Sequence, residues 1–457
     1  MEKNSTVGAQ RLSALFDAGT FVEIGAYLKR PGSDEREAVV CGYGAVNGKL
    51  VFAFSQDSDR IHGAVDEFHA KKIEETYEKA IRNGAPVIGL FDSKGAVVYD
   101  GASALSSYST LLGCVSRASG KIVQIAIVTG VCPGLCAGCV SMFDFVLTVA
   151  GKSEIYVNSP FLIGKDTGDA AYAAANGLST LSASSEEEAY GLARKLVDLV
   201  PSDCNSRAEV EAADDVNRAV DLTFTSAGAY AAADAMNTLA DAGSFIEIGK
   251  EFAPEMLTGL ARFGGVSAGI VANNPAIKDG AVTKDGLRKA ARMVSFCDCF
   301  GLPVVTLVDS AGAYVSKDEE SGLAAGIGKL SMTYANASCA LVTVMLGRAY
   351  GCAMPVMGSK ALGADLVLAL PGATAGILSP ASAVAFLWND RINADYSRED
   401  AEKEWTDKYA SAEAIASAGA VDDIIEPAET RQRICAGIYM LLYKNSGVQG
   451  KHANLPL

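Results

Sequence analysis

The chain has 457 residues, of which 49% are hydrophobic, and a formal net charge of −15 at pH 7. This length and apolar content are sufficient for two domains with separate cores, and the acidic balance argues against a nucleic-acid partner, because nucleic-acid binding depends on a basic surface. The polar N-terminal sequence lacks the apolar run of a secretory signal. We therefore expect a cytoplasmic protein whose eleven cysteines are mostly reduced, buried thiols.

The first half of the chain opens with the pattern of a β-hairpin followed by a helix and a strand. Residues 39–57 are rich in β-forming residues and contain the turn dipeptide Asn47-Gly48. Residues 64–84 have a helical pattern that stops at a glycine. Residues 86–93 then form an apolar run typical of a strand buried on both faces. This succession predicts an α/β domain.

Residues 125–143 carry no charged side chain and are formally long enough for a membrane helix. Their counterpart in the second half, 342–360, carries Arg348 and Lys360. The uncharged stretch also has a Gly-Pro-Gly-rich centre, which is poor for a spanning helix. We therefore expect a buried strand followed by a buried helix.

Three cysteines, Cys132, Cys136 and Cys139, have a C-x3-C-x2-C spacing that could hold an iron–sulfur cluster. The second half keeps only Cys352 in this block, and it aligns with Leu135. The histidines are too scattered to form a zinc site; they are His62, His69 and His452. We therefore expect no metal.

Residues 181–210 mix Ser-Glu polarity with an amphipathic stretch, and we interpret them as the connection between two domains. Within this segment a helix is predicted from Ser184 or Ser185, through an acidic first turn, to about Val200.

The second half repeats the first. Four blocks recur in the same order: 15–25 at 239–249, 85–96 at 302–313, 127–137 at 344–354, and 144–151 at 365–372. A hairpin pattern at 260–275 and a helical pattern at 285–303 also match the first half. The period is far longer than the roughly 20 to 50 residues of a solenoid repeat, so each copy is a whole domain. We place the two domains at 1–210 and 211–457.

The two halves share a glycine-turn arrangement of the backbone at matching positions, and they do not share a catalytic side chain. In each half an apolar strand ends in a glycine turn followed by helix-like residues: Gly134 and Leu135 in the first, Gly351, Cys352 and Ala353 in the second. The preceding strand of each half ends in a Gly-Ala turn: Gly95-Ala96 and Gly312-Ala313. Backbone N–H groups at such turns, helped by the positive end of a helix, can hold a developing oxyanion. Alternatively, these glycines only allow the strand ends to pack closely.

The chain resembles the carboxyltransferase (β) subunits of biotin-dependent acyl-CoA carboxylases, such as propionyl-CoA carboxylase, and the α subunits of the related biotin-dependent decarboxylases. The resemblance covers nearly the whole chain. It is carried by GYGAVNGKLVFAFSQD, HAKKI, ARFGGVSAGIVANNP, ARMVSFCDCFGLPVVTLVD, RAYGCAMPVMGSK and the terminal KHANLPL. It implies an α/β fold made of two crotonase-type domains in tandem, each a ββα superhelix, in agreement with the repeat.

In that family the first turn receives the thioester oxygen of acyl-CoA and the second receives the ureido oxygen of biotin. The resemblance places the catalytic donors on Gly134 and Leu135 in the first half and on Cys352 and Ala353 in the second. Leu135 and Cys352 replace family glycines, which leaves backbone donation possible only if their φ angles stay negative. Val97 stands where the family has an arginine.

The resemblance also implies partners. No biotin-acceptor sequence and no ATP-binding module are present. Biotin would therefore be presented by a carrier protein or biotinylated subunit, with no cofactor bound covalently here and a coenzyme A thioester as substrate. A biotin carboxylase or a membrane decarboxylase subunit would complete the reaction. In the family the active site is shared between subunits, so we expect a homo-oligomer, either a dimer or a trimer of dimers.

Two features bear on the substrate. The helix with His69, Lys71 and Lys72 is one of the few basic clusters, so it could bind the phosphates of acyl-CoA, although it could also be a solvated face. Met354 and Pro355 follow the second turn and predict an apolar wall that suits a small acyl group such as propionyl. Three activities remain open: a carboxylase subunit, the α subunit of a methylmalonyl- or glutaconyl-CoA decarboxylase, and a CoA-thioester binding protein or hydrolase that does not use biotin.

Overall fold

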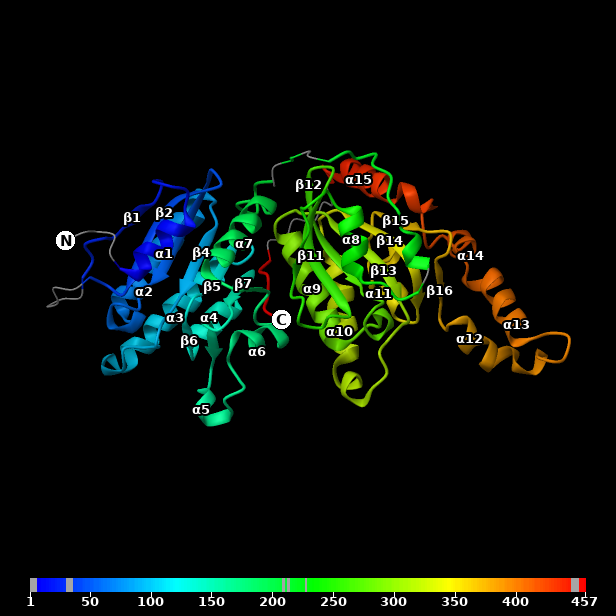
Figure 1. The fold of residues 1–457 in the computed structure, drawn as a ribbon, viewed down its shortest axis with the longest axis horizontal. Coiled ribbons are helices and arrows are strands. Elements are labelled where there is room, and N and C mark those ends of the chain that lie inside the picture. Colours follow the sequence, from blue (N-terminus) through cyan, green and yellow to red (C-terminus); the bar gives the residue numbers. More distant parts are fainter. Residues whose placement is uncertain (1–5, 30–35, 208–209, 212–213, 227, 445–451) are drawn as a thin grey trace. The chain divides into compact units, whose positions relative to one another are not determined.

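The computed structural model describes residues 6–29, 36–207, 210–211, 214–226, 228–444 and 452–457. They divide into two compact units, one containing the described residues up to 207 and from 452, and the other those from 210 to 444 (Figure 1). Each unit has a sheet with helices packed against it.

The first unit contains a seven-stranded sheet in the order β1-β2-β3-β4-β5-β7-β9. Its strands are β1 Val22–Ile24, β2 Val39–Val46, β3 Lys49–Gln56, β4 Val87–Phe91, β5 Gln124–Val128, β7 Phe145–Val149 and β9 Leu181–Ala183. The first three strands are antiparallel, and the pairs from β3 onward are parallel. A separate parallel pair is formed by β6 Val131–Pro133 and β8 Glu154–Tyr156. The helices are α1 Val7–Leu15, α2 Glu67–Asn83, α3 Ala102–Ala118, α4 Leu135–Ser141, α5 Pro160–Ile163, α6 Ala170–Ala175 and α7 Glu186–Leu199.

The second unit repeats this plan in an eight-stranded sheet with the order β10-β11-β12-β13-β14-β15-β17, and β16 also pairs with β14. Its strands are β10 Ile246–Ile248, β11 Met256–Phe263, β12 Val266–Asn273, β13 Val304–Ser310, β14 Leu341–Tyr350, β15 Leu366–Ala369, β16 Thr374–Gly376 and β17 Asp423–Ile424. Its helices are α8 Ala232–Leu239, α9 Lys284–Cys299, α10 Lys317–Asn336, α11 Ala353–Val356, α12 Pro380–Ala383, α13 Arg398–Trp405, α14 Ala412–Ser417 and α15 Thr430–Leu441.

The elements predicted from local patterns are confirmed. β2 and β3 form a hairpin through Asn47-Gly48, and β11 and β12 form its counterpart. Helix α2 ends at Gly84, whose φ of 59° is the left-handed conformation of a helix-terminating glycine. Residues 125–143 span β5, β6 and α4, a buried strand and a helix as expected. In the described part of the chain no helix combines the length and apolarity needed to span a membrane.

Two expectations about the domain ends differ from the structure. Residues 181–210 are not a free connection, because β9 is the last strand of the first sheet and α7 belongs to the same unit. The helix itself begins as predicted, with the Ser185 hydroxyl accepting the Glu188 N–H at 3.2 Å. The C-terminal residues belong to the first unit and not to the second domain: the Asn454 side-chain amide donates to Asp144 at 3.0 Å, and its backbone N–H donates to Ser119 at 3.1 Å.

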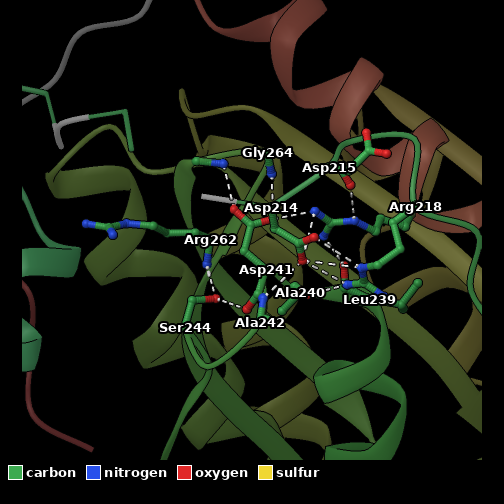
Figure 2. A network of polar contacts seen from close by, with 12 residues as sticks. Asp214, Asp215, Arg218, Leu239, Ala240, Asp241, Ala242, Ser244, Arg262 and Gly264 are labelled. Carbon is green, nitrogen blue, oxygen red and sulfur yellow. Dashed lines mark hydrogen bonds and ion pairs between the residues drawn. The ribbon is translucent and has the colours of Figure 1, made fainter. Parts of the chain in front are cut away.

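An aspartate in each unit ties the hairpin turn to the last helix. In the second unit, Asp241 accepts the N–H groups of Gly264 at 2.9 Å and Gly265 at 2.6 Å, and it also accepts a guanidinium N–H of Arg431 at 2.6 Å (Figure 2). Arg431, on α15, is fully buried and also donates to the Leu239 carbonyl at 2.7 Å. Because these charged groups are all hydrogen-bonded, the buried ion pair fixes how the hairpin and helix pack.

The first unit has the same arrangement at its surface. Asp17 accepts the N–H groups of Asn47 at 3.2 Å and Gly48 at 2.9 Å, and it pairs with Arg194 on α7. Arg194 also donates to the Leu15 carbonyl at 2.6 Å. Both charged side chains are about a quarter exposed, 26% for Asp17 and 28% for Arg194, so solvent weakens this copy of the interaction.

The two copies predict unequal effects of the same substitution. Asp241→Asn should lower the free energy of unfolding of the second unit by about 1–3 kcal/mol, because it removes the nearer carboxylate of a buried guanidinium and leaves only Asp214, at 3.5 Å. Asp17→Asn should cost about 1 kcal/mol or less. Both tryptophans, Trp388 and Trp405, lie in the second unit, so their fluorescence during urea denaturation reports on it. Asp17 lies in the first unit, so the stability of Asp17→Asn is measured by circular dichroism, which follows both units. Equal losses of stability in the two variants would contradict the assignment.

Candidate active site at two matched turns

The first turn follows β4 and leaves one backbone N–H without an acceptor. The Ser93 hydroxyl accepts the N–H of Gly95 at 3.1 Å. The Val65 N–H donates to the Gly95 carbonyl at 2.9 Å, and the Val97 N–H donates to the Val65 carbonyl at 3.0 Å. These bonds hold the residues on both sides of Ala96, whose own N–H has no acceptor among the described residues.

The second turn of the first unit connects β6 to α4. Gly134, with φ of 60°, precedes the helix and donates its N–H to the Tyr156 carbonyl at 2.7 Å. Leu135 is the first helical residue, and within the described chain its N–H also has no acceptor. A Cβ atom at Gly95 would lie 3.6 Å from the Pro133 ring, so the two turns adjoin. The first unit therefore carries two free N–H donors on neighbouring turns.

The second unit reproduces this pattern bond for bond. The Gly312 N–H donates to the Ser310 hydroxyl at 3.2 Å, and the Val282 N–H donates to the Gly312 carbonyl at 2.8 Å. The Tyr314 N–H donates to the Val282 carbonyl at 2.9 Å, and the Gly351 N–H donates to the Gly376 carbonyl at 2.9 Å. A Cβ atom at Gly312 would lie 3.2 Å from the Tyr350 carbonyl oxygen. The N–H groups of Ala313 and Cys352 are the ones left without an acceptor in the described part of this unit's two turns.

The structure agrees with the alignment of the two repeats at the second turn, and it differs from the pair Cys352 and Ala353 that the family resemblance gave. The counterpart of Gly134-Leu135 is Gly351-Cys352, since Gly351 has the positive φ of 55° and Cys352 the helical φ of −70°. Ala353 lies one residue further along and is fully buried. The negative φ angles at Leu135 and Cys352 meet the condition for backbone donation by residues with side chains. Burial raises the pKa of the Cys352 thiol, which keeps it protonated near neutral pH.

The prediction of a basic cluster on α2 is wrong for two of its three residues, His69 and Lys72. His69 is fully buried, and burial lowers its pKa to about 4, so the ring is neutral at pH 7. The Lys72 ammonium is buried, donates to the Val39 carbonyl at 2.8 Å and lies 3.6 Å from a Glu23 carboxylate oxygen. Only Lys71 is exposed. The helical pattern alone could not reveal which of these neighbours faces the sheet.

Sequence reasoning missed a cavity beside the first turn. Its volume is about 350 Å³, and it is lined by residues of β8, α5 and the loop that leads to α6: Glu154, Tyr156, Pro160, Phe161, Lys165, Thr167 and Asp169. Tyr156 links it to the turn, because its carbonyl accepts the Gly134 N–H. The lining residues lie on a short helix and loops with no periodic pattern, and no sequence signal singled them out.

The cysteines form no metal centre in the described chain. Cys132, Cys136 and Cys139 are buried in the first core, and no group of three or more histidine, cysteine or acidic side chains is placed to hold a metal among the residues that the structure describes. Burial is also the main cause that raises the pKa of Cys132 and Cys139.

The burial of His69 predicts a pH-dependent stability. Its pKa is lowered to about 4 from an ordinary value of 6.5, chiefly by burial, with the Asp66 carboxylate opposing the shift. Between pH 6.5 and 4 the unfolded chain binds a proton that the folded chain does not, so the free energy of unfolding falls as the pH falls, by about 3 kcal/mol at pH 4. His69→Leu should flatten this dependence in urea denaturation followed by circular dichroism. If the free energy of unfolding of His69→Leu depends on pH between 7 and 4.5 as steeply as that of the wild type, His69 is not the cause.

Comparison with known proteins agrees with the geometry. Residues 1–455 match the family model of the carboxyl transferase domain. The chain is 32% identical to the propionyl-CoA carboxylase carboxyltransferase subunit of Haloferax mediterranei, over 100% of this chain and 94% of the relative. It is 33% identical to the methylmalonyl-CoA decarboxylase α subunit of Propionigenium modestum, over 98% and 92%.

A solved structure of transcarboxylase 12S, with methylmalonyl-coenzyme A and methylmalonic acid bound, superposes with a TM-score of 0.90 at 30% identity, covering 98% of this chain and 92% of that one. This likeness confirms the expected tandem crotonase-type fold. The chain therefore belongs to the carboxyl transferase family and is a carboxyltransferase.

Proposed function

We propose that the chain transfers a carboxyl group between biotin, presented by another protein, and the α-carbon of a short acyl-CoA of the propionyl or methylmalonyl type. The observation that carries this proposal is the matched pair of turns. Ala96 and Leu135 offer free N–H groups in one unit, and Ala313 and Cys352 offer them in the other. Negative charge develops on the thioester oxygen and on the ureido oxygen during transfer, and each turn can stabilise one of them.

The first unit is the better host for acyl-CoA. Its turn adjoins a cavity, and two lysines of this unit are exposed, Lys71 on α2 and Lys165 at the cavity. Neither lysine forms an ion pair with any described residue. Helix α2 begins two residues after Val65, which bonds to the turn. Coenzyme A carries phosphates, and in a chain with a net charge of −15 such cations are scarce.

The second unit then receives biotin. Its turn is followed by Met354, which is half-buried, and Pro355, which is exposed. Neither carries a charge, so the wall beside this turn is apolar. When presented on its carrier, carboxylated biotin supplies the carboxyl group. The N–H groups of Ala313 and Cys352 would hold its ureido oxygen, with the glycine before each of them setting the geometry.

The direction of transfer has two candidates, because the relatives named above are a carboxylase subunit and a decarboxylase α subunit at nearly equal identity. The purified chain, given methylmalonyl-CoA and free biotin, should form carboxylated biotin and propionyl-CoA. Release of free coenzyme A without biotin would overturn the proposal in favour of a hydrolase. The partner that completes the overall reaction separates the two directions. An ATP-dependent biotin carboxylase would indicate a carboxylase, and a membrane decarboxylase subunit would indicate a decarboxylase.

We also propose that the active site is completed in an oligomer. Apolar side chains on segments adjoining the turns are exposed: Val98, Tyr99 and Phe161 in the first unit, and Val315 and Ile377 in the second. Exposed apolar side chains of this kind mark protein interfaces. The transcarboxylase 12S of the solved structure assembles as a hexamer. Light scattering should give a dimer or a hexamer, and a stable monomer of 47.3 kDa would contradict this.

Gly134→Ala tests the first turn. Alanine at a φ of 60° is strained, so the turn should shift and carboxyl transfer should fall about 100-fold, the scale of losing one oxyanion donor. Gly151→Ala is the matched control, because Gly151 also has a positive φ of 70° and, like Gly134, has no atom within 4 Å of an added Cβ. Equal activities of the two variants would argue against the turn as the site.

Lys165→Glu and Lys71→Glu test the phosphate site. If Lys165 at the cavity pairs with a phosphate, its reversal should weaken coenzyme A binding about tenfold in calorimetry at low salt, corresponding to about 1–2 kcal/mol. Lys71→Glu has the same charge change on α2. If only Lys71→Glu weakens coenzyme A binding, the phosphates bind at α2. If neither variant weakens it, neither lysine belongs to the phosphate site.

A further inference from the structure

A break in the second sheet lies next to the second turn. Strands β13 and β14 pair regularly up to Val308 and Met345, and then pair again at Ser310 and Ala349. One residue of β13, Asp309, therefore stands opposite three residues of β14. Such bulges are common next to active sites, where they redirect the backbone.

The Asp309 carboxylate fills this break. It accepts the backbone N–H of Arg348 at 3.1 Å and the Nε–H of the same residue at 3.0 Å. The Asp309 side chain is only 6% exposed, and a Cβ atom at Gly347 would lie 2.5 Å from its carboxylate. Glycine at 347 is thus required for the carboxylate to reach the strand. The Arg348 guanidinium extends further, to the Asp279 carbonyl at 3.4 Å, which also accepts the Ala311 N–H at 3.2 Å.

The first unit has the same break with a different cation. β5 ends at Val128 and β6 begins at Val131. Asp92 lies against Gly130, where any Cβ atom would clash with its carboxylate. Its guanidinium partner is Arg11 of α1, at 2.8 Å. Arg11 also bonds to Glu186 of α7, so the cation of this copy comes from a helix, whereas Arg348 lies on β14, the strand next to Asp309.

We propose that Asp309 and Arg348 are positioning residues for the second turn, which hold its two free N–H groups at the spacing needed for the ureido oxygen. Asp309 precedes Gly312 by three residues, and Arg348 precedes Gly351 by three. One ion pair therefore fixes both strand ends from which Ala313 and Cys352 follow. This inference rests on the proposed function, and it adds two side chains that touch neither substrate.

The expected consequence is a loss of rate without a loss of thioester binding. A displacement of about 1 Å in such a site costs about 100-fold in rate. Asp309→Asn keeps the shape of the side chain but weakens its interaction with the Arg348 guanidinium, and Arg348→Gln removes that guanidinium. Both variants should lower kcat for transfer from methylmalonyl-CoA to free biotin by about 10- to 100-fold, while the KM and the calorimetric Kd for the thioester stay within about twofold. The double variant should be no slower than the slower single one, because the two residues act as a unit.

A direct readout needs no biotin. Hydrogen exchange of the segments 310–315 and 350–354 should become faster in Asp309→Asn and Arg348→Gln. Arg433→Gln is the matched control, because it breaks another Asp–Arg pair of the second unit, with Asp423 on β17, and it should change neither exchange nor kcat.

Unchanged kcat, additive losses in the double variant, or exchange that rises equally over the whole second unit would overturn the positioning role. A wild-type chain that neither binds the thioester nor transfers a carboxyl group would instead overturn the proposed function itself.

Discussion

Two glycines with a positive φ angle, Gly134 and Gly351, set the geometry on which the candidate active site depends. Each donates its own N–H to a neighbouring strand, to Tyr156 in the first unit and Gly376 in the second. Each precedes a helix, Gly134 directly and Gly351 with Cys352 as the N-cap residue between. The N–H of the next residue then belongs to the helix start and has no intrahelical acceptor. Because only glycine takes a positive φ without strain, one residue type at one position both ends the strand and exposes the donor. The Ser-supported Gly-Ala turn on the adjacent strand supplies the second donor of each site.

Duplication preserved this backbone and let the supporting side chains diverge. The hairpin-to-helix ion pair is buried at Asp241 and Arg431 but partly exposed at Asp17 and Arg194. The carboxylate behind each turn also persists, although its cation comes from the neighbouring strand in one unit and from α1 in the other. A carboxylate in a strand break has to be neutralised and hydrogen-bonded wherever it occurs, but the source of the cation is free to vary.

Much of the fold could be predicted, and the failures have physical causes. The Asn47-Gly48 turn and the Gly84 helix end are local, since the residues themselves prefer those backbone angles. The burial of His69 and Lys72 is not local: both lie on the face of α2 that packs against the sheet, beside the exposed Lys71. The strand β9 escapes prediction because three residues are too few to show a pattern, and they become a strand only by pairing with β7. Likewise, Asn454 joins the first unit through Asp144, which is far away in the sequence.

The sequence by itself determined the duplication, the α/β class, the family and the glycine turns, because repeated motifs and backbone preferences are properties of short segments. Only the tertiary structure decided which N–H groups of those turns are free, since that depends on acceptors from other segments such as Val65, Tyr156 and Gly376. It also decided that a cavity lies beside the first turn. Hydrogen bonding and burial are relations between distant segments, and no local pattern encodes them.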